Sequence, residues 1–211
     1  MGLSNGNSES KTYLKLKGMR QEDEYPFLAK SVKKDGRWTT EGEWKEISGQ
    51  LKSVKFNVKS SEQYGDKEMC EIEIVDDAVY NVEFSLSSGV GRSIVNSLSS
   101  VEKADLIKLS FYVKTTNDNK SFKSVYVELD GEMAKWAMSY ADQKKLVTEI
   151  KDPDSGEVIK RKYDKLVAKL KEMCKLQGNA DAKPNLQQAS SELDEHMNAT
   201  YNTQAPAVEE E

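Results

Sequence analysis

Hydrophobic and polar residues alternate along the segment 106–129, which predicts two strands joined by a polar loop. On the first strand the apolar face holds Ile107, Leu109, Phe111 and Val113, and the other face holds Lys108, Ser110, Tyr112 and Lys114. After the loop, the apolar face continues through Val125, Val127 and Leu129, with Tyr126 pointing the other way. A strand has a side-chain period of two, so one face is predicted to be core and the other to meet solvent or a ligand.

The same alternation predicts strands at 12–17, 68–76 and 79–86, and a hairpin over 27–38 with its turn at Asp35-Gly36. A longer strand from about Trp44 changes its apolar parity at Lys52-Ser53, which requires a β-bulge or sharp bend. Apolar residues at helical spacing between 88 and 98 predict a helix with Ser88 as N-cap.

Beyond Gly131 the pattern predicts a helix over 132–146, a second hairpin over 146–162 and an amphipathic helix over 163–178. The chain is thus divided into a disordered start (1–11), an N-terminal hairpin region (12–46), a central region (47–131), a C-terminal region (132–178) and a disordered acidic tail (179–211). These boundaries follow changes in periodicity and composition.

The central region resembles the oligonucleotide/oligosaccharide-binding (OB) fold, because three strands, a helix and two strands follow one another and the first strand is bent. This resemblance implies a mainly β fold with α additions. It consists of a five-stranded OB-like barrel, with the N-terminal hairpin packed on it and C-terminal helices. An SH3-like barrel or an unrelated mixed sheet is the alternative.

Charge is unevenly distributed: the chain carries −5 in all, and residues 178–211 alone carry one basic and seven acidic side chains. With this tail the chain resembles single-stranded DNA-binding proteins of the bacterial and bacteriophage kind. The resemblance implies that the chain binds single-stranded DNA independently of its sequence, in DNA replication, recombination or repair. The expected location is the cytoplasm, or the host cytoplasm for a viral protein. The family's tail recruits replication or repair proteins and competes with DNA. This chain departs from the family pattern because it ends in Glu209, Glu210 and Glu211 rather than in a hydrophobic residue.

Lysines attract phosphates and aromatic rings stack on bases, so exposed residues of both kinds are the candidate contacts. They are Lys52, Lys55, Lys59, Tyr64, Lys67, Lys108, Tyr112, Lys114, Lys120, Phe122 and Lys123. Lys120, Phe122 and Lys123 are the favoured ones, in a predicted loop; Tyr112 and Tyr126 are equally suited to contact a covering segment. The outward carboxylates Glu71, Glu73 and Glu83 would repel phosphates unless lysines pair with them or another segment covers them.

Catalytic chemistry is not predicted. The one histidine, His196, lies in the tail, and no cysteine–histidine cluster has metal-ligand spacing. Cys70 and Cys174 are predicted to be reduced, buried thiols. Residues 87–93 place glycines and an arginine before a helix, which suits an ordinary turn better than a phosphate cradle. No enzyme activity, cofactor, metal or membrane contact is therefore expected.

Two other functions remain open at this point: a protein-interaction or viral assembly module that binds no nucleic acid, and a magnesium-dependent nuclease. The pattern also leaves the oligomeric state open, and it does not distinguish DNA from RNA as the ligand.

Overall fold

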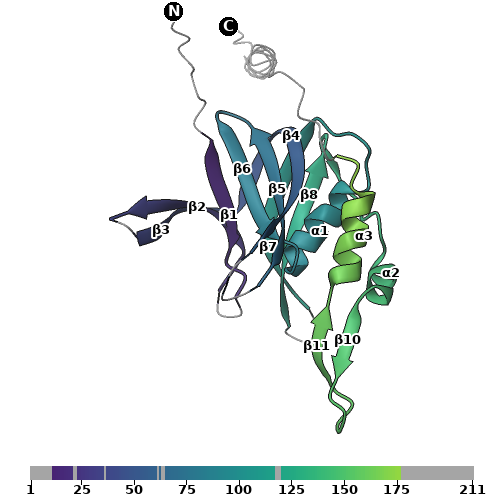
Figure 1. Ribbon diagram of the computed structural model, residues 1–211. Coiled ribbons are helices and arrows are strands. Elements are labelled where there is room, and N and C mark those ends of the chain that lie inside the picture. The colour runs from purple at the N-terminus through teal and green to yellow at the C-terminus, as the bar shows by residue number, and fades with distance from the viewer. Residues whose placement is uncertain are drawn as a thin grey trace, which may run out of the picture. The chain divides into compact units, whose positions relative to one another are not determined.

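A computed structural model describes residues 11–20, 23–35, 37–60, 62, 65–116 and 120–176. The strands are β1 (Thr12–Lys17), β2 (Phe27–Lys34), β3 (Arg37–Trp44), β4 (Glu46–Lys59), β5 (Lys67–Val75), β6 (Val79–Ser85), β7 (Leu106–Thr115), β8 (Ser121–Leu129), β9 (Glu132–Met133), β10 (Thr148–Lys151) and β11 (Val158–Lys162). The helices are α1 (Gly89–Leu98), α2 (Tyr140–Lys145) and α3 (Asp164–Met173) (Figure 1).

Nine strands of this described part form one mixed sheet in the order β3-β2-β1-β6-β5-β4-β7-β8-β9. Neighbouring strands run antiparallel except β1 and β6, which run parallel with Leu14 opposite Val82. β10 and β11 form a separate two-stranded sheet. The chain is mainly β, as predicted, and the strands of segment 12–46 belong to the same sheet as those of the central region.

The predicted five-stranded OB-like barrel is wrong, because the sheet is open. The predicted succession of strands and helix is present as β4, β5, β6, α1, β7 and β8. In the described residues, however, no pairing of β6 with β8 closes these strands into a barrel. β1 pairs with the edge of β6 that such a closure would use. Alternation predicts that a segment is a strand, but it does not predict which edge that strand joins.

The change of parity in β4 is the predicted β-bulge. Leu51 lies opposite Ile74 and Ser53 lies opposite Glu73, so Lys52 is the extra residue. The bulge keeps the apolar residues of both halves of β4 on one face. It also divides the strand's pairing, because residues before the bulge pair with β7 and residues on both sides of it pair with β5.

Gly49 of β4 lies close to the backbone of β5. Its φ is 153°, and a Cβ placed on it would lie 2.6 Å from the carbonyl oxygen of Val75. We expect Gly49→Ala to lower the free energy of unfolding by about 2 kcal/mol, because the two backbones must move apart. Urea unfolding measures this loss. In the control Gly89→Ala, where the added carbon meets nothing within 4 Å, the change should stay below about 1 kcal/mol; equal losses would contradict this account.

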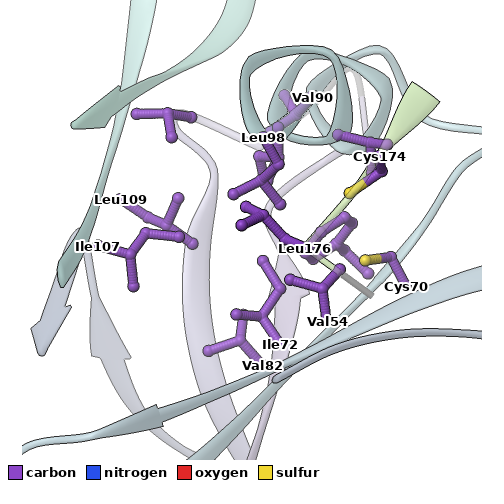
Figure 2. Close-up of a cluster of buried hydrophobic side chains, with 14 of the residues drawn as sticks. Val54, Cys70, Ile72, Val82, Val90, Leu98, Ile107, Leu109, Cys174 and Leu176 are labelled. Carbon is purple, nitrogen blue, oxygen red and sulfur yellow. The ribbon is translucent and has the colours of Figure 1, made fainter. Parts of the chain in front are cut away.

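The inner face of the sheet packs against α1 and α3 and forms the core. Figure 2 shows strand residues of this face, including Ile72, Val82 and Ile107, facing Val90 and Leu98 of α1. Helix α1 begins as predicted, since Ser88 Oγ accepts a hydrogen bond of 2.9 Å from the amide of Gly91. On α3 the predicted apolar stripe is buried at Leu166, Val167 and Leu170. The amphipathic patterns of both helices therefore identified faces that are buried.

Both cysteines are free thiols in this core. Burial raises the pKa of the Cys174 thiol and raises that of Cys70 further. The thiolate is the reactive form, so we expect neither thiol of the native chain to react with a disulfide reagent at pH 8. Both should react within minutes after unfolding in guanidinium. A rapid release of one equivalent from the native chain would show that one thiol is accessible.

The predicted helix over 132–146 is wrong, because only its last part, α2, is helical and its start forms β9 at the sheet edge. Asn96 of α1 holds the chain between them. Its Nδ2 donates to the carbonyl of Met138 and its Oδ1 accepts from the amide of Met138, both at 2.9 Å. Asn96 is fully buried. These tertiary bonds satisfy the backbone of Met138, which a helix would otherwise do.

The rest of the C-terminal region agrees with the prediction. The hairpin is formed by β10 and β11, and the amphipathic helix is α3. Gly178, the predicted acidic tail 179–211 and all of the predicted disordered start 1–11 except Lys11 lie outside the described residues.

Candidate nucleic-acid interface

The outer face of the sheet, opposite α1 and α3, carries the aromatic residues predicted on β7 and β8. The register places Ser110 opposite Tyr126, Tyr112 opposite Ser124, and Lys114 opposite Phe122. Inner-face residues of the same two strands, such as Leu109 and Val127, are buried. The predicted assignment of the two faces is therefore confirmed.

Tyr112 and Tyr126 stack on each other on this outer face. Their ring centroids lie 4.1 Å apart and the ring planes differ by 11°. The neighbouring Tyr112 hydroxyl, through hydrogen bonding, raises the pKa of Tyr126. Tyr126 is 47% exposed and Phe122, near the start of β8, is 53% exposed. The face thus offers a stacked pair and a separate ring to solvent.

The lysines beside these rings differ in their charge environment. Lys114 is exposed and forms no ion pair with a described residue, and Lys120 is exposed directly before β8. Lys108 lies 3.1 Å from Glu46. Hydrogen bonds from Ser110 and Lys108 lower the pKa of Glu46, which therefore stays charged. Lys108 is thus largely neutralised, and Lys114 is the better phosphate contact.

Lys123 does not lie in a loop as predicted, because β8 begins at Ser121 and includes both Phe122 and Lys123. Lys123 has inner-face parity, and its side chain is only 15% exposed. Its Nζ lies 3.9 Å from an oxygen of Asp23 and donates to the carbonyl of Arg20. This lysine connects β8 to the segment between β1 and β2 and is poorly placed to contact a ligand.

The lysines predicted on the first strand form a separate group. Lys52, expected to face outward, is 9% exposed at the bulge. Lys55 and Lys59 lie in the half of β4 after the bulge, which pairs with β5 but not with β7. Lys55 is opposite Glu71, and Lys59 is opposite Lys67. They are therefore not cross-strand neighbours of β7 as predicted. Tyr64 and the tail residues Glu209, Glu210 and Glu211 lie outside the described residues.

The outward carboxylates of β5 and β6 are partly paired with lysines. Glu73 accepts a hydrogen bond of 2.6 Å from Lys11, and Glu83 pairs with Lys59. These pairs reduce the negative charge of the outer face, although exposed pairs contribute little to stability. Two of the three outward carboxylates, Glu73 and Glu83, therefore have the lysine partners that would let this face tolerate phosphates.

A second basic region is formed by α2, β11 and α3, where no nucleic-acid contact was predicted from the sequence. Tyr140 is 74% exposed on α2. Two hollows, of about 230 Å³ and 410 Å³, lie beside β11, and Arg161 and Tyr163 line both. The only signal in the sequence was the excess of basic residues in segment 131–177, with eleven against eight acidic ones.

Within the described residues, no group of three or more histidine, cysteine or acidic side chains is arranged to hold a metal ion. The helices described here include none with the length and apolar character needed to cross a membrane. Comparisons of the chain with protein-family models, with curated proteins and with solved structures found no match.

Proposed function

We propose that this chain binds single-stranded nucleic acid without sequence preference, through the outer face of β7 and β8. The observation that carries the proposal is the set of aromatic rings Tyr112, Tyr126 and Phe122 on one exposed sheet face. Bases stack on such rings whatever their identity, because every base has a π-face. A cluster of exposed aromatic rings lowers the solubility of a protein, and such clusters commonly mark binding sites, so these rings favour a binding role.

Lys114 and Lys120 supply the phosphate contacts beside these rings. Both are exposed, and Lys114 lies directly opposite Phe122 in the register. A lysine beside a ring lets one nucleotide stack while its phosphate is neutralised. Phosphate contacts of this kind release counterions, so the affinity of the complex falls as salt rises.

The proposal extends to a cellular role in replication, recombination or repair within the cytoplasm. It rests on the acidic composition of residues 178–211, which contain seven acidic side chains and one basic one. A tail of this charge suits recruitment of partner proteins with basic surfaces. Glu209, Glu210 and Glu211 are the proposed contacts of that tail.

Fluorescence anisotropy with labelled oligo(dT) and oligo(U) tests the binding proposal. At low salt we expect a dissociation constant in the micromolar range or tighter, which weakens as salt rises. Lys114→Gln should reduce the slope of log K against log salt by about 0.7, the value for one phosphate contact on a single strand. Lys145→Gln, which removes a lysine already paired with Asp142 at 2.7 Å, is the control and should leave the slope unchanged.

The titration is made with the full chain and with a variant that lacks residues 179–211, because the acidic tail competes with nucleic acid in the proposal. Absence of binding by both proteins at low salt rejects the proposed function. Binding by both with equal slopes for the two lysine variants rejects the assignment of Lys114.

A protein-interaction module is the second candidate, and one observation favours it. Met133 of the edge strand β9 and Trp136 after it are both exposed. An edge strand with exposed apolar neighbours can pair with another chain. A stable complex or ordered oligomer formed by a chain without affinity for nucleic acid would support this candidate over the first.

A further inference from the structure

A hollow of about 230 Å³ lies among α2, the β10–β11 hairpin and α3, away from the rings of β7 and β8. Its wall contains Arg92, Tyr140, Lys144, Glu149, Arg161 and Tyr163. Three of these side chains are cationic and one is acidic, so the wall carries a net charge of +2. A small hollow with an excess of positive charge suits an anionic ligand.

Arg92 is the least usual member of this wall. Its guanidinium is half-buried and lies 3.6 Å from the ring centroid of Tyr163. Its Nη1 donates to the carbonyls of Leu86 and Ser87 at 3.1 and 2.6 Å. Among the described residues no carboxylate pairs with it. Burial of the guanidinium lowers the pKa of Arg92, and an anion beside it would offset this loss of hydration.

Lys144 and Arg161 stand beside Arg92 in the same wall. Arg161 Nε donates to Glu149 at 3.0 Å, so one cation is already paired. Lys144 is exposed and has no ion pair within the described chain. Two cations without a carboxylate partner match the double negative charge of a phosphate monoester near neutral pH.

The Tyr140 ring forms the rim of the hollow. It is 74% exposed, and it lies one helical turn from Lys144 on α2. The base of a nucleotide therefore fits against the Tyr140 ring while the phosphate of the same nucleotide lies among the cations. We propose that this hollow binds a nucleotide, with its phosphate monoester among Arg92, Lys144 and Arg161 and its base on Tyr140.

Two sources present this chemistry: a free mononucleotide and the phosphorylated end of a nucleic-acid strand. The site is independent of the proposed face on β7 and β8, since it is built from other elements. A nucleic-acid strand whose phosphorylated end occupies the hollow would bind more tightly than a strand without that phosphate. A free nucleotide in the hollow would not displace a strand bound along β7 and β8.

NMR titration of the ¹⁵N-labelled full chain with thymidine 5′-monophosphate tests the proposal. We expect amide shifts at Arg92, Gln143, Lys144 and Arg161, and at least tenfold weaker binding of thymidine, which lacks the charged group. Inorganic phosphate should shift the same amides except near Tyr140. Absence of shifts at these residues with millimolar nucleotide overturns the proposal.

Variants of exposed residues keep the test independent of folding. Lys144→Gln should weaken binding of the nucleotide about tenfold or more, and Tyr140→Ala should remove the advantage of the nucleotide over inorganic phosphate. Lys145→Gln is the matched control on the same helix, because Lys145 pairs with Asp142 and does not line the hollow. Equal effects of Lys144→Gln and Lys145→Gln would overturn the assignment.

A comparison of 5′-phosphorylated with 5′-hydroxyl oligo(dT) separates the two sources. Tighter binding of the phosphorylated strand, lost in Lys144→Gln, identifies a strand end as the ligand. Equal binding of both strands, with the mononucleotide still bound, identifies a free nucleotide. The double variant Phe122→Ala/Tyr126→Ala should leave the shifts that the mononucleotide causes at Arg92, Lys144 and Arg161 unchanged, because neither ring lines the hollow. Failure of the β7–β8 proposal and failure of this one therefore give different results.

Discussion

Replacing both Phe122 and Tyr126 by alanine should weaken binding of oligo(dT) at least about 30-fold. Each ring that stacks on a base contributes about 1–3 kcal/mol to binding, and about 1.4 kcal/mol corresponds to a tenfold change in affinity. Both rings are about half exposed in the free chain, so their removal leaves no cavity in the core. Anisotropy titrations at one low salt concentration measure the change.

The control for this variant is Tyr13→Ala. Tyr13 is also an exposed tyrosine of the outer face, but it lies on β1, which four strands separate from β8 in the sheet order. We expect its removal to change the affinity less than about twofold. A loss for Tyr13→Ala as large as that of the double variant would mean that the bases do not stack on β8.

The second large effect is expected at Asn96. In Asn96→Ala, the buried amide of Met138 loses its partner, and its carbonyl keeps only the 3.2 Å hydrogen bond from Gln143 Nε2. An unsatisfied buried polar group costs about 1–3 kcal/mol and a lost hydrogen bond about 0.5–1.5 kcal/mol, so we expect the free energy of unfolding to fall by about 2–4 kcal/mol. Thermal or urea unfolding of the full chain measures this loss.

Asn81→Ala is the matched control, because Asn81 is also a buried asparagine but its Oδ1 has no hydrogen-bond partner among the described residues. Its removal breaks no bond of that oxygen and should cost less than about 1.5 kcal/mol. Similar losses for the two variants would show that burial of the side chain, rather than its two bonds to Met138, stabilises the fold.

Local rules predicted the features that depend on neighbouring residues. Alternation identified both faces of β7 and β8, and the change of parity in β4 identified the bulge at Lys52. The hydroxyl of Ser88 identified the start of α1. In each case the signal is a pattern within a few consecutive residues, so the sequence alone contains it.

Features that depend on distant segments were missed. The open sheet follows from the pairing of β1 with β6, and the irregular chain before α2 follows from the bonds of Asn96 to Met138. Lys123 was assigned to a loop, although its parity with Val125 places it on the inner face. The hollow under Tyr140 was not predicted, because its wall comes from several separate segments of the chain.

The parallel pairing of β1 with β6 has a consequence for the order of folding. β1 pairs with β2, which follows it in the chain, but its second partner β6, where Val82 lies opposite Leu14, is synthesised only after β2, β3, β4 and β5 have been made. Contacts between residues far apart in sequence require the intervening chain to lose conformational entropy before the contacts can form, which slows folding. The β1–β2–β3 strands can therefore join the rest of the sheet only after β6 is made, and the late formation of this pairing is expected to limit the folding rate of the whole sheet.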